Sequence, residues 1–350
     1  MSRVIASPET TVAYSPTWNG GPTPRIAAVV STFGRPEFLE ALVDSLSAQS
    51  LPHDQYEVVI VDNGSLDTTW PLLQQLAERS PARMAVTTLP ENRGPGGGRN
   101  HGFTIVRAPM AAITDDDCLP TSGWLAAMLA ALESGNDVVQ GQVQANPIER
   151  DGGGPWDHTK WITTPTPFFE TCNVAYRVSA FRDVGGFDET DALTAQVSGR
   201  AFGEDALLAW RVHEAGGHTT FAEESLVYHR IVPATFGDWL NGQRNLVGFP
   251  GLGNRSPLVA SWFWHRHFLS KESALFDVAI VAVVAALVLR RPWLALGLLP
   301  WVRHRWSDAL YRARGEQSLA LFRLAQLALS DGVSLASLLE GSVRHKRLVL

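Results

Sequence analysis

Three consecutive aspartates carry the strongest chemical signal in this sequence. Asp115, Asp116 and Asp117 follow a short apolar run, and Thr114 and Cys118 flank them. Adjacent carboxylates repel one another, so holding them together costs free energy unless a cation compensates their charge. Mg²⁺ and Mn²⁺ prefer oxygen ligands and often keep a diphosphate in the same coordination shell. The triplet predicts a divalent-cation site, although an isolated triplet is more often a solvated acidic loop or a helix N-cap.

A second acidic pair stands at the start of a predicted helix. Glu204 and Asp205 follow Gly203 and precede a helical pattern over residues 206–214. A carboxylate in this place can be a general base that deprotonates a hydroxyl, or it can simply cap the helix. Further along, His229 is a candidate ligand that would complete the metal shell, although a lone histidine is more often structural.

Two other segments suit a nucleotide. Asp62 ends an apolar run over residues 56–61, where its carboxylate can accept hydrogen bonds from a base or a ribose. Residues 91–100 are rich in glycine, which lets backbone amides approach an anion. Arg93 and Arg99 add cations suited to phosphate in that segment. The segment is not the dinucleotide fingerprint, because it follows the third predicted strand and its glycine spacing differs.

These residues must be positioned by an alternation of strands and helices. The expected strands span residues 26–31, 56–61, 84–89, 110–114 and 138–143, and the expected helices span residues 37–49, 66–78, 98–107 and 124–132. The alternation favours an α/β fold with a doubly wound, mostly parallel sheet and flanking helices. Ligands bind such sheets beyond the carboxyl ends of the strands. Asp62 and the aspartate triplet both follow strands, so we expect them to face one crevice.

The later part of the chain is less regular. We expect an irregular loop at 145–170, a strand at 171–177 and a short strand within 221–228. The pattern becomes apolar and helical after about residue 273. The runs 278–289 and 293–302 are uncharged, but neither reaches the roughly 20 residues that span a bilayer. They predict a re-entrant or interfacial hairpin, or an oligomer contact.

Two more helices with leucine and alanine on one face are expected at 318–329 and 333–339.

The charge of the chain is divided between its two parts. Residues 1–253 carry 16 Lys/Arg against 29 Asp/Glu, and residues 254–350 carry 13 against 6. An acidic part suits cation binding, and a basic, Trp-rich, apolar part suits an anionic membrane surface, or it is simply a solvated basic face.

Other features narrow the class of protein. No basic stripe coincides with a nucleic-acid motif, so no nucleic-acid partner is expected. Cys118 and Cys172 form no disulfide framework, and residues 1–24 do not resemble a secretion signal, which favours the cytoplasm or the inner face of the cell membrane. We expect an extension at 1–24, a catalytic domain at 25–253 and a helical, membrane-associated or oligomerising region at 254–350.

Taken together, the segments resemble the inverting glycosyltransferases of family 2, which have the GT-A fold, a Rossmann-like sheet. The resemblance runs from about residue 26 to residue 245. It is carried, in order, by residues 29–36, 61–65, 92–102, 114–117, 171–177 with 184–188, and 203–205 with Leu208 and Arg211. Each segment alone is a weak signal, and their order makes the match specific. Residues 243–245 resemble rhamnosyltransferase-like members, which hints at a deoxyhexose donor.

The resemblance implies a role for each matching acidic residue. Asp62 would bind the base, Asp115 the ribose and Asp117 the metal, and Asp116 could serve either of the last two tasks. Asp205 would be the general base.

The remaining candidate residues complete this site. Glu204 is the alternative base. Thr32, Arg93 and Arg99 would join the nucleotide-sugar contacts, and His229 would join the metal.

The expected reaction is transfer from a nucleotide-diphosphate sugar to an acceptor hydroxyl, with Mn²⁺ or Mg²⁺, in the synthesis of a cell-surface glycan or glycolipid. A nucleotidyltransferase is one alternative, but it would have a Gly-rich loop with Lys or Arg directly after the first strand, and the turn at 32–36 is short. The other alternative is a non-catalytic nucleotide-sugar sensor or scaffold, which has no need for the charge strain of the carboxylates. The chain also lacks the Gln-x-x-Arg-Trp element of processive synthases.

Overall fold

The structure is a computed structural model of the 350-residue chain, and it describes residues 11–149, 153–190, 193 and 202–350. These residues form two compact units. The sheet unit is built from described residues within 1–151, 159–191 and 204–231, and the helical unit from those within 152–158, 192–203 and 232–350.

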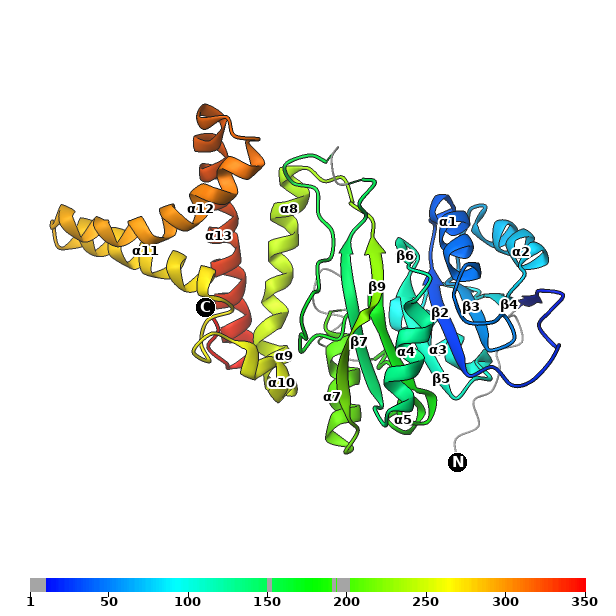
Figure 1. Cartoon of the computed structure of the whole chain (residues 1–350). Coiled ribbons are helices and arrows are strands. Elements are labelled where there is room, and N and C mark those ends of the chain that lie inside the picture. Colours follow the sequence, from blue (N-terminus) through cyan, green and yellow to red (C-terminus); the bar gives the residue numbers. More distant parts are fainter. Residues whose placement is uncertain (1–10, 150–152, 191–192, 194–201) are drawn as a thin grey trace. The chain divides into compact units, whose positions relative to one another are not determined.

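The strands of the sheet unit form one mixed sheet (Figure 1). In the described residues its strand order is β1-β4-β3-β2-β5-β8-β7-β9-β6. The strands are β1 Thr11–Tyr14, β2 Ile26–Thr32, β3 Tyr56–Asp62, β4 Arg83–Thr88, β5 Met110–Asp115, β6 Cys118–Pro120, β7 Val138–Ala145, β8 Val174–Arg177 and β9 Thr219–His229. The neighbours β4, β3, β2 and β5 are parallel, whereas β1, β6 and β8 pair with their neighbours antiparallel.

The order of the strands reverses at β2, which lies between β3 and β5. Thr32 is in register with Asp62 of β3, and Ser31 is in register with Asp115 of β5. The strands are held there by burial, because Val30 and Ile60 are fully shielded from solvent and each such side chain contributes about 1.5–3 kcal/mol. The predicted acidic groups therefore lie at the carboxyl end of the parallel strands, at the switch point of the sheet.

Helices connect the strands, and their apolar residues are buried. They are α1 Pro36–Ser47, α2 Thr69–Arg79, α3 Gly94–Ile105, α4 Trp124–Glu133, α5 Val178–Asp183 and α7 Glu204–Glu214. In α1 the buried residues Leu39, Leu42 and Leu46 recur at helical spacing. In α3 a Cβ at Gly98 would lie 2.1 Å from the Ser31 side chain, so glycine is what allows this helix to approach β2.

The expected α/β fold is confirmed, with differences at the ends of elements. The helix expected at 98–107 begins four residues earlier, because Gly94 has a positive φ of 75° and a proline occupies the first turn. The helix expected at 66–78 begins at Thr69, whose amide donates to the Asp67 carboxylate over 2.9 Å. The strand expected at 171–177 is a 3₁₀ turn at Thr171–Asn173 followed by β8.

The helical unit contains the remaining elements. They are α8 Phe236–Gln243, η2 Arg244–Gly248, α9 Phe249–Arg255, α10 Pro257–Trp262, α11 Lys271–Val288, η3 Pro292–Leu298, α12 Leu299–Arg312 and α13 Gln317–His345. A buried polar junction joins α12 to α13. The Trp301 indole N–H donates to Asp331 over 2.8 Å, and Arg305 forms an ion pair with the same carboxylate.

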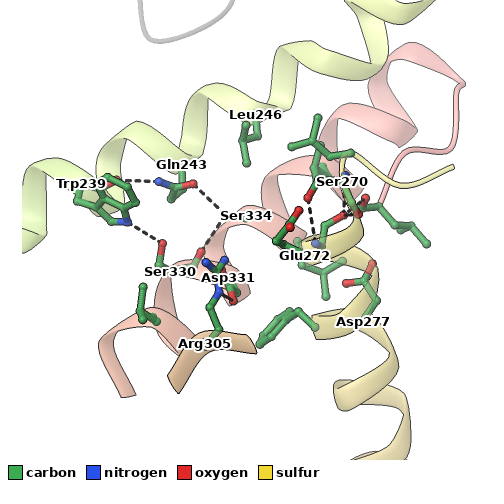
Figure 2. A pocket seen from close by; sticks show the side chains of 17 residues that line it. Trp239, Gln243, Leu246, Ser270, Glu272, Asp277, Arg305, Ser330, Asp331 and Ser334 are labelled. Carbon is green, nitrogen blue, oxygen red and sulfur yellow. Dashed lines mark hydrogen bonds and ion pairs between the residues drawn. The ribbon is translucent and has the colours of Figure 1, made fainter. Parts of the chain in front are cut away.

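A cavity of about 190 Å³ lies between α8, α11 and α13 (Figure 2). Trp239 of α8 donates to Ser330 over 3.1 Å, and Ser334 donates to Gln243 over 3.1 Å. Ser270 begins α11 here with a capping box. The inner end of α11 is therefore polar and held by hydrogen bonds.

The prediction of two helices at 318–329 and 333–339 was wrong, because α13 is continuous over 29 residues. Gly332 lies inside it without breaking it, since a glycine in a helix costs only about 1 kcal/mol. The apolar runs at 278–289 and 293–302 were expected to be too short to cross a bilayer, but another helix has the length for it. In the described part of the chain, α13 is long and apolar enough by length and composition, with 22% of its most apolar window buried.

Candidate active site

The aspartate triplet is held by two arginines and a threonine. Asp116 is buried, and it accepts hydrogen bonds from Thr32 Oγ1 at 2.7 Å and from Arg35 Nη1 at 3.1 Å. The same Arg35 nitrogen contacts Asp117 Oδ2 at 3.2 Å. Burial raises the pKa of Asp116 to about 6, and the charge of Arg35 and the bond from Thr32 oppose this shift. Arg35 thus bridges two carboxylates that would otherwise repel each other.

Arg99 ties the triplet to the second acidic pair. Its side chain is only 8% exposed, and it lies between Asp115 Oδ1 at 2.7 Å and Glu204 Oε1 at 3.2 Å. The position follows from α3, whose glycines bring the helix against β2 and so direct Arg99 to the carboxyl end of β5. The structure therefore brings Arg99, Asp115 and Glu204 together, and the guanidinium that was expected near the nucleotide is paired with two carboxylates.

Glu204 and Asp205 are adjacent but differ in their surroundings. The carboxylate of Glu204 is engaged by Arg99, whereas Asp205 Oδ1 accepts a 2.9 Å hydrogen bond from the amide of Ala206. Loss of solvent, followed by the negative charges of Glu170 and Glu204, raises the pKa of Asp205 to about 7. A carboxylate with such a pKa is suited to accept a proton near neutral pH.

Asp117 and His229 meet because β6 and β9 are paired. Cys118 stands opposite His229 in this antiparallel pair, and the Arg230 amide donates to the Asp117 carbonyl over 3.0 Å. His229 Nδ1 lies 2.8 Å from the Arg230 carbonyl oxygen, which can only accept, so Nδ1 is the donor. In the neutral ring the lone pair is then on Nε2, which lies 3.6 Å from Asp117 Oδ1.

This arrangement fits a divalent cation. Two acceptor atoms face each other beyond hydrogen-bond distance, and a histidine that binds a metal usually donates its other N–H to a carbonyl or carboxylate. Cys118 lies in the same group, within 4.8 Å of the other ligand atoms. Without a metal, burial raises the pKa of its thiol well above the ordinary value, and the thiol donates to Asp117 over 3.8 Å. A carboxylate with an imidazole suits Mn²⁺ better than Mg²⁺, which takes oxygen ligands.

Asp62 lies at the end of β3, fully buried. Its Oδ1 accepts from the Ser65 amide and its Oδ2 accepts from Thr88 Oγ1, both at 3.0 Å. Two of the roughly four acceptor positions of this carboxylate are filled, and the side chain has no surface open to solvent. Gly64, with a φ of 81°, makes the turn after Asp62, and a Cβ there would strike the backbone of Glu91 at 2.5 Å.

Arg93 is placed differently from the other predicted residues. Its guanidinium pairs with Glu189 over 2.7 Å, and Asn100 donates to the same carboxylate. Its amide donates to Asn63 Oδ1 over 3.1 Å. The structure therefore holds the Arg93 side chain on Glu189 and does not join it to the aspartate triplet.

Sequence reasoning missed two residues of this site. Arg35 was only part of a matching segment, yet the parallel pairing of β2 with β5 would have suggested that the turn after β2 faces the triplet. Glu170 gave no signal, because it follows an irregular loop. Its Oε2 accepts from Gln140 and from Thr166, each at 2.9 Å, and its charge acts on Asp205.

Two family models match this chain. One, described as "Glycosyl transferase family 2", matches residues 27–185, and the other, "Glycosyl transferase family group 2", matches residues 156–312. Together they extend from the first buried strand into the helical unit.

Similar proteins support the same family. Glycosyltransferase AglE of Haloferax volcanii is 24% identical over 85% of this chain and 89% of its own length. The pre-mycofactocin glycosyltransferase of Mycobacterium tuberculosis is 28% identical over 63% of this chain, which spans only 46% of that relative.

A solved structure shares the fold. The mannosyltransferase PcManGT from Pyrobaculum calidifontis, in complex with GDP-Man and Mn²⁺, superposes with a TM-score of 0.57 at 19% identity, covering 94% of this chain and 90% of its own. The fold is that of the GT-A glycosyltransferases. With both family models and curated relatives in agreement, the chain belongs to glycosyltransferase family 2.

Proposed function

We propose that this chain is an inverting, metal-dependent glycosyltransferase, which moves a sugar from a nucleotide-diphosphate sugar to an acceptor hydroxyl. The observation that carries the proposal is that the carboxylates of the site have different partners, which suit them to different roles. Arg99 engages Glu204 and leaves Asp205, with a pKa raised to about 7, as the free base. The Asp117–His229 pair is arranged separately as a cation site.

The donor would be held at the switch point of the sheet. Asp62 is fully buried without nucleotide, so it would accept from the base once the turn after β3 opens, and Asp115 at the end of β5 would contact the ribose. Thr32 orients Asp116 beside it. Arg93, tied to Glu189, would reach a phosphate only by leaving that carboxylate. We assign this chemistry to residues 25–253, and the region 254–350 to attachment.

Asp117 and His229 are the residues that would hold the cation. When bound, a divalent cation neutralises charge on the diphosphate as it leaves the sugar. Arg35 forms ion pairs with Asp116 and Asp117, so in the nucleotide-free protein it competes with the cation for these carboxylates.

The transfer itself is a single displacement. The acceptor oxygen attacks the anomeric carbon as the bond from that carbon to the diphosphate oxygen breaks, and the configuration inverts. The acceptor proton moves to the Asp205 carboxylate, whose raised pKa suits this task. Glu204 keeps Arg99 in place and Glu170 raises the proton affinity of the base.

A donor panel tests the proposal. UDP-, dTDP- and GDP-sugars, GDP-mannose among them, are added with Mn²⁺ or with EDTA, and thermal stability and donor hydrolysis are followed. We expect one nucleotide to stabilise the protein only with the metal, and to release a nucleoside diphosphate. Release of pyrophosphate would indicate a nucleotidyltransferase. Binding without turnover against any acceptor would indicate a sensor.

Arg35 gives a separate prediction about the metal. Removing its charge with Arg35→Gln frees Asp116 and Asp117 from a competing cation, so the nucleotide-free protein should bind Mn²⁺ about tenfold more tightly. Calorimetric titration of Mn²⁺ measures this directly. Arg79→Gln, which removes an exposed arginine paired with Glu40, is the matched control. Weaker Mn²⁺ binding in Arg35→Gln would show that Arg35 assists the metal site.

The class of acceptor is proposed from the character of residues 254–350. An enzyme of the cytoplasm that acts on a cell-surface glycan or glycolipid meets its acceptor at the inner face of the membrane. The basic charge of residues 254–350 suits such a location.

A further inference from the structure

A helical hairpin in the helical unit exposes an unusually large apolar surface. It comprises residues 278–302, namely the outer part of α11, the connection after it, η3 and the start of α12, and is called the hairpin arm below. Figure 1 shows α11 extending away from α13. Gly297 of η3 packs closely on Ala282 of α11, since a Cβ on the glycine would lie 2.6 Å from the alanine methyl group. The arm is therefore a packed pair, with apolar side chains left outside.

The exposure of these side chains is far from that of a core. The most exposed are Val281 at 67%, Leu287 at 74%, Val288 at 73%, Leu289 at 62%, Trp293 at 63% and Leu296 at 62%. Soluble proteins rarely leave so many neighbouring large apolar side chains in water, and such patches mark contact with a partner or a membrane.

Charged residues lie at both ends of the hairpin arm, with opposite signs. The acidic residues Glu272 and Asp277 lie at the inner end of α11, beside the cavity between α8, α11 and α13 (Figure 2). From residue 278 to residue 307 there is no Asp or Glu. The tip carries Arg290 and Arg291, both exposed. The inner end of α11 is therefore polar, the arm is apolar, and its tip is cationic with an exposed tryptophan. An anionic lipid surface complements this arrangement.

The length of the arm sets how deep it can go. Its uncharged stretch in α11 and the connection, residues 278–289, has 12 residues, which rise about 18 Å in a helix against about 30 Å for a bilayer core. An arm of this length that entered tip first would leave both arginines in the hydrocarbon core. An arm that lies flat in one leaflet buries its apolar side chains and keeps the arginines at phosphate depth.

We infer that the hairpin arm docks this protein on an anionic membrane surface by inserting its apolar side chains into one leaflet, with Arg290 and Arg291 on lipid phosphates. The inference deepens the proposed function, because it would place the enzyme where a lipid-linked acceptor lies. A second copy of the chain is a poorer occupant of this face. Pairing of two arms tip to tip would bring four arginines together without an acidic partner on either arm.

The test uses the full chain and vesicles of phosphatidylcholine with or without phosphatidylglycerol, in a sedimentation assay. We expect binding to the anionic vesicles that falls as salt rises. Leu287→Glu with Val288→Glu should abolish binding to both kinds of vesicle. Arg290→Ser with Arg291→Ser should lower the affinity for anionic vesicles about 25-fold, since each arginine near such a surface contributes about fivefold.

The controls separate the arm from general effects. Val343→Glu adds a charge at an 81% exposed apolar residue of α13, outside the arm, and should bind as the wild type does. Circular dichroism shows that each variant is folded. Hydrolysis of a soluble donor without vesicles shows that the sheet unit works, independently of the arm.

Two outcomes would overturn the inference. One is a wild-type protein that hydrolyses its donor yet binds neither kind of vesicle, which leaves the proposed function intact. The other is a dimer in analytical ultracentrifugation that Leu287→Glu with Val288→Glu dissociates, which makes the arm a contact between copies of the chain. Vesicle binding in a protein inert to every donor would instead reject the proposed function and keep the arm.

Discussion

Asp205→Asn should lose about 10²–10⁴-fold in turnover while it keeps its affinity for the donor. The asparagine has nearly the same shape but cannot accept the acceptor proton. Asp205 accepts only a local amide hydrogen bond from Ala206 among the contacts described, and Arg99 holds Glu204 and Asp115 without it. The measurement is nucleoside diphosphate release at saturating donor and acceptor, together with donor affinity by calorimetry.

The pH dependence of the wild type tests the same assignment. The base must be unprotonated, so turnover should rise with pH until the group with a pKa raised to about 7 is ionised, and then level off. Glu204→Gln is the control, and it should weaken donor binding through Arg99 while it retains this pH profile. Full activity in Asp205→Asn, or a profile that moves only in Glu204→Gln, would transfer the role of base to Glu204.

The raised pKa of Asp205 also predicts a gain in stability in the inactive variant. An unfolded aspartate has a pKa of about 3.9, so between that value and about 7 the folded state holds a proton that the unfolded state releases. Stability therefore falls as pH rises through this window, and the loss is complete above it. Asp205→Asn cannot ionise, so its melting temperature should exceed that of the wild type at about pH 8, with the gap closing towards about pH 4.

Asp117→Ala should lose metal dependence and sugar transfer together. The substitution removes one of the two acceptor atoms that face each other across 3.6 Å, and Arg35 then keeps only Asp116 as a partner in the triplet. Loss of an outer partner of a metal ligand costs about 10–100-fold in affinity, so loss of a ligand should cost about 100-fold or more for Mn²⁺. Thermal shift and nucleoside diphosphate release are followed across a Mn²⁺ titration.

The control for this variant lies at the other end of the sheet. Asp54 is exposed in the loop that precedes β3, at the amino end of that strand, and Asp54→Ala should titrate as the wild type does. His229→Ala should fall between the two, because it removes the imidazole and leaves the carboxylates. An unchanged Mn²⁺ titration in Asp117→Ala would move the metal site away from the β6–β9 pair.

Most of the site's location could be predicted from the sequence, for a local reason. Short apolar runs such as 26–31 and 56–61 are typical of strands in a parallel sheet, which is buried on both faces. Parallel strands bring their carboxyl ends to one edge of the sheet. Asp62 and Asp115 could therefore be assigned to one crevice without coordinates. Helix ends were less predictable, since Gly94 and Asp67 set them by turn and capping geometry.

Long-range pairing is what the sequence could not supply. The local sequence around Arg35 does not predict that it bridges Asp116 and Asp117, because those contacts depend on the pairing of β2 with β5. The helices expected at 318–329 and 333–339 are one helix for a related reason. Packing against α12 stabilises α13 through Gly332, where local propensity is weak.

By itself, the sequence determined the fold class, the edge of the sheet where the carboxylates gather, and the apolar, basic character of residues 254–350. These depend on hydrophobic periodicity and on residue type, which are local properties. Only the tertiary structure decided which carboxylate is free, because the bond from Arg99 to Glu204 distinguishes it from Asp205. It also decided that His229 faces Asp117, because two strands distant in sequence pair there and bring an imidazole and a carboxylate within reach of one cation.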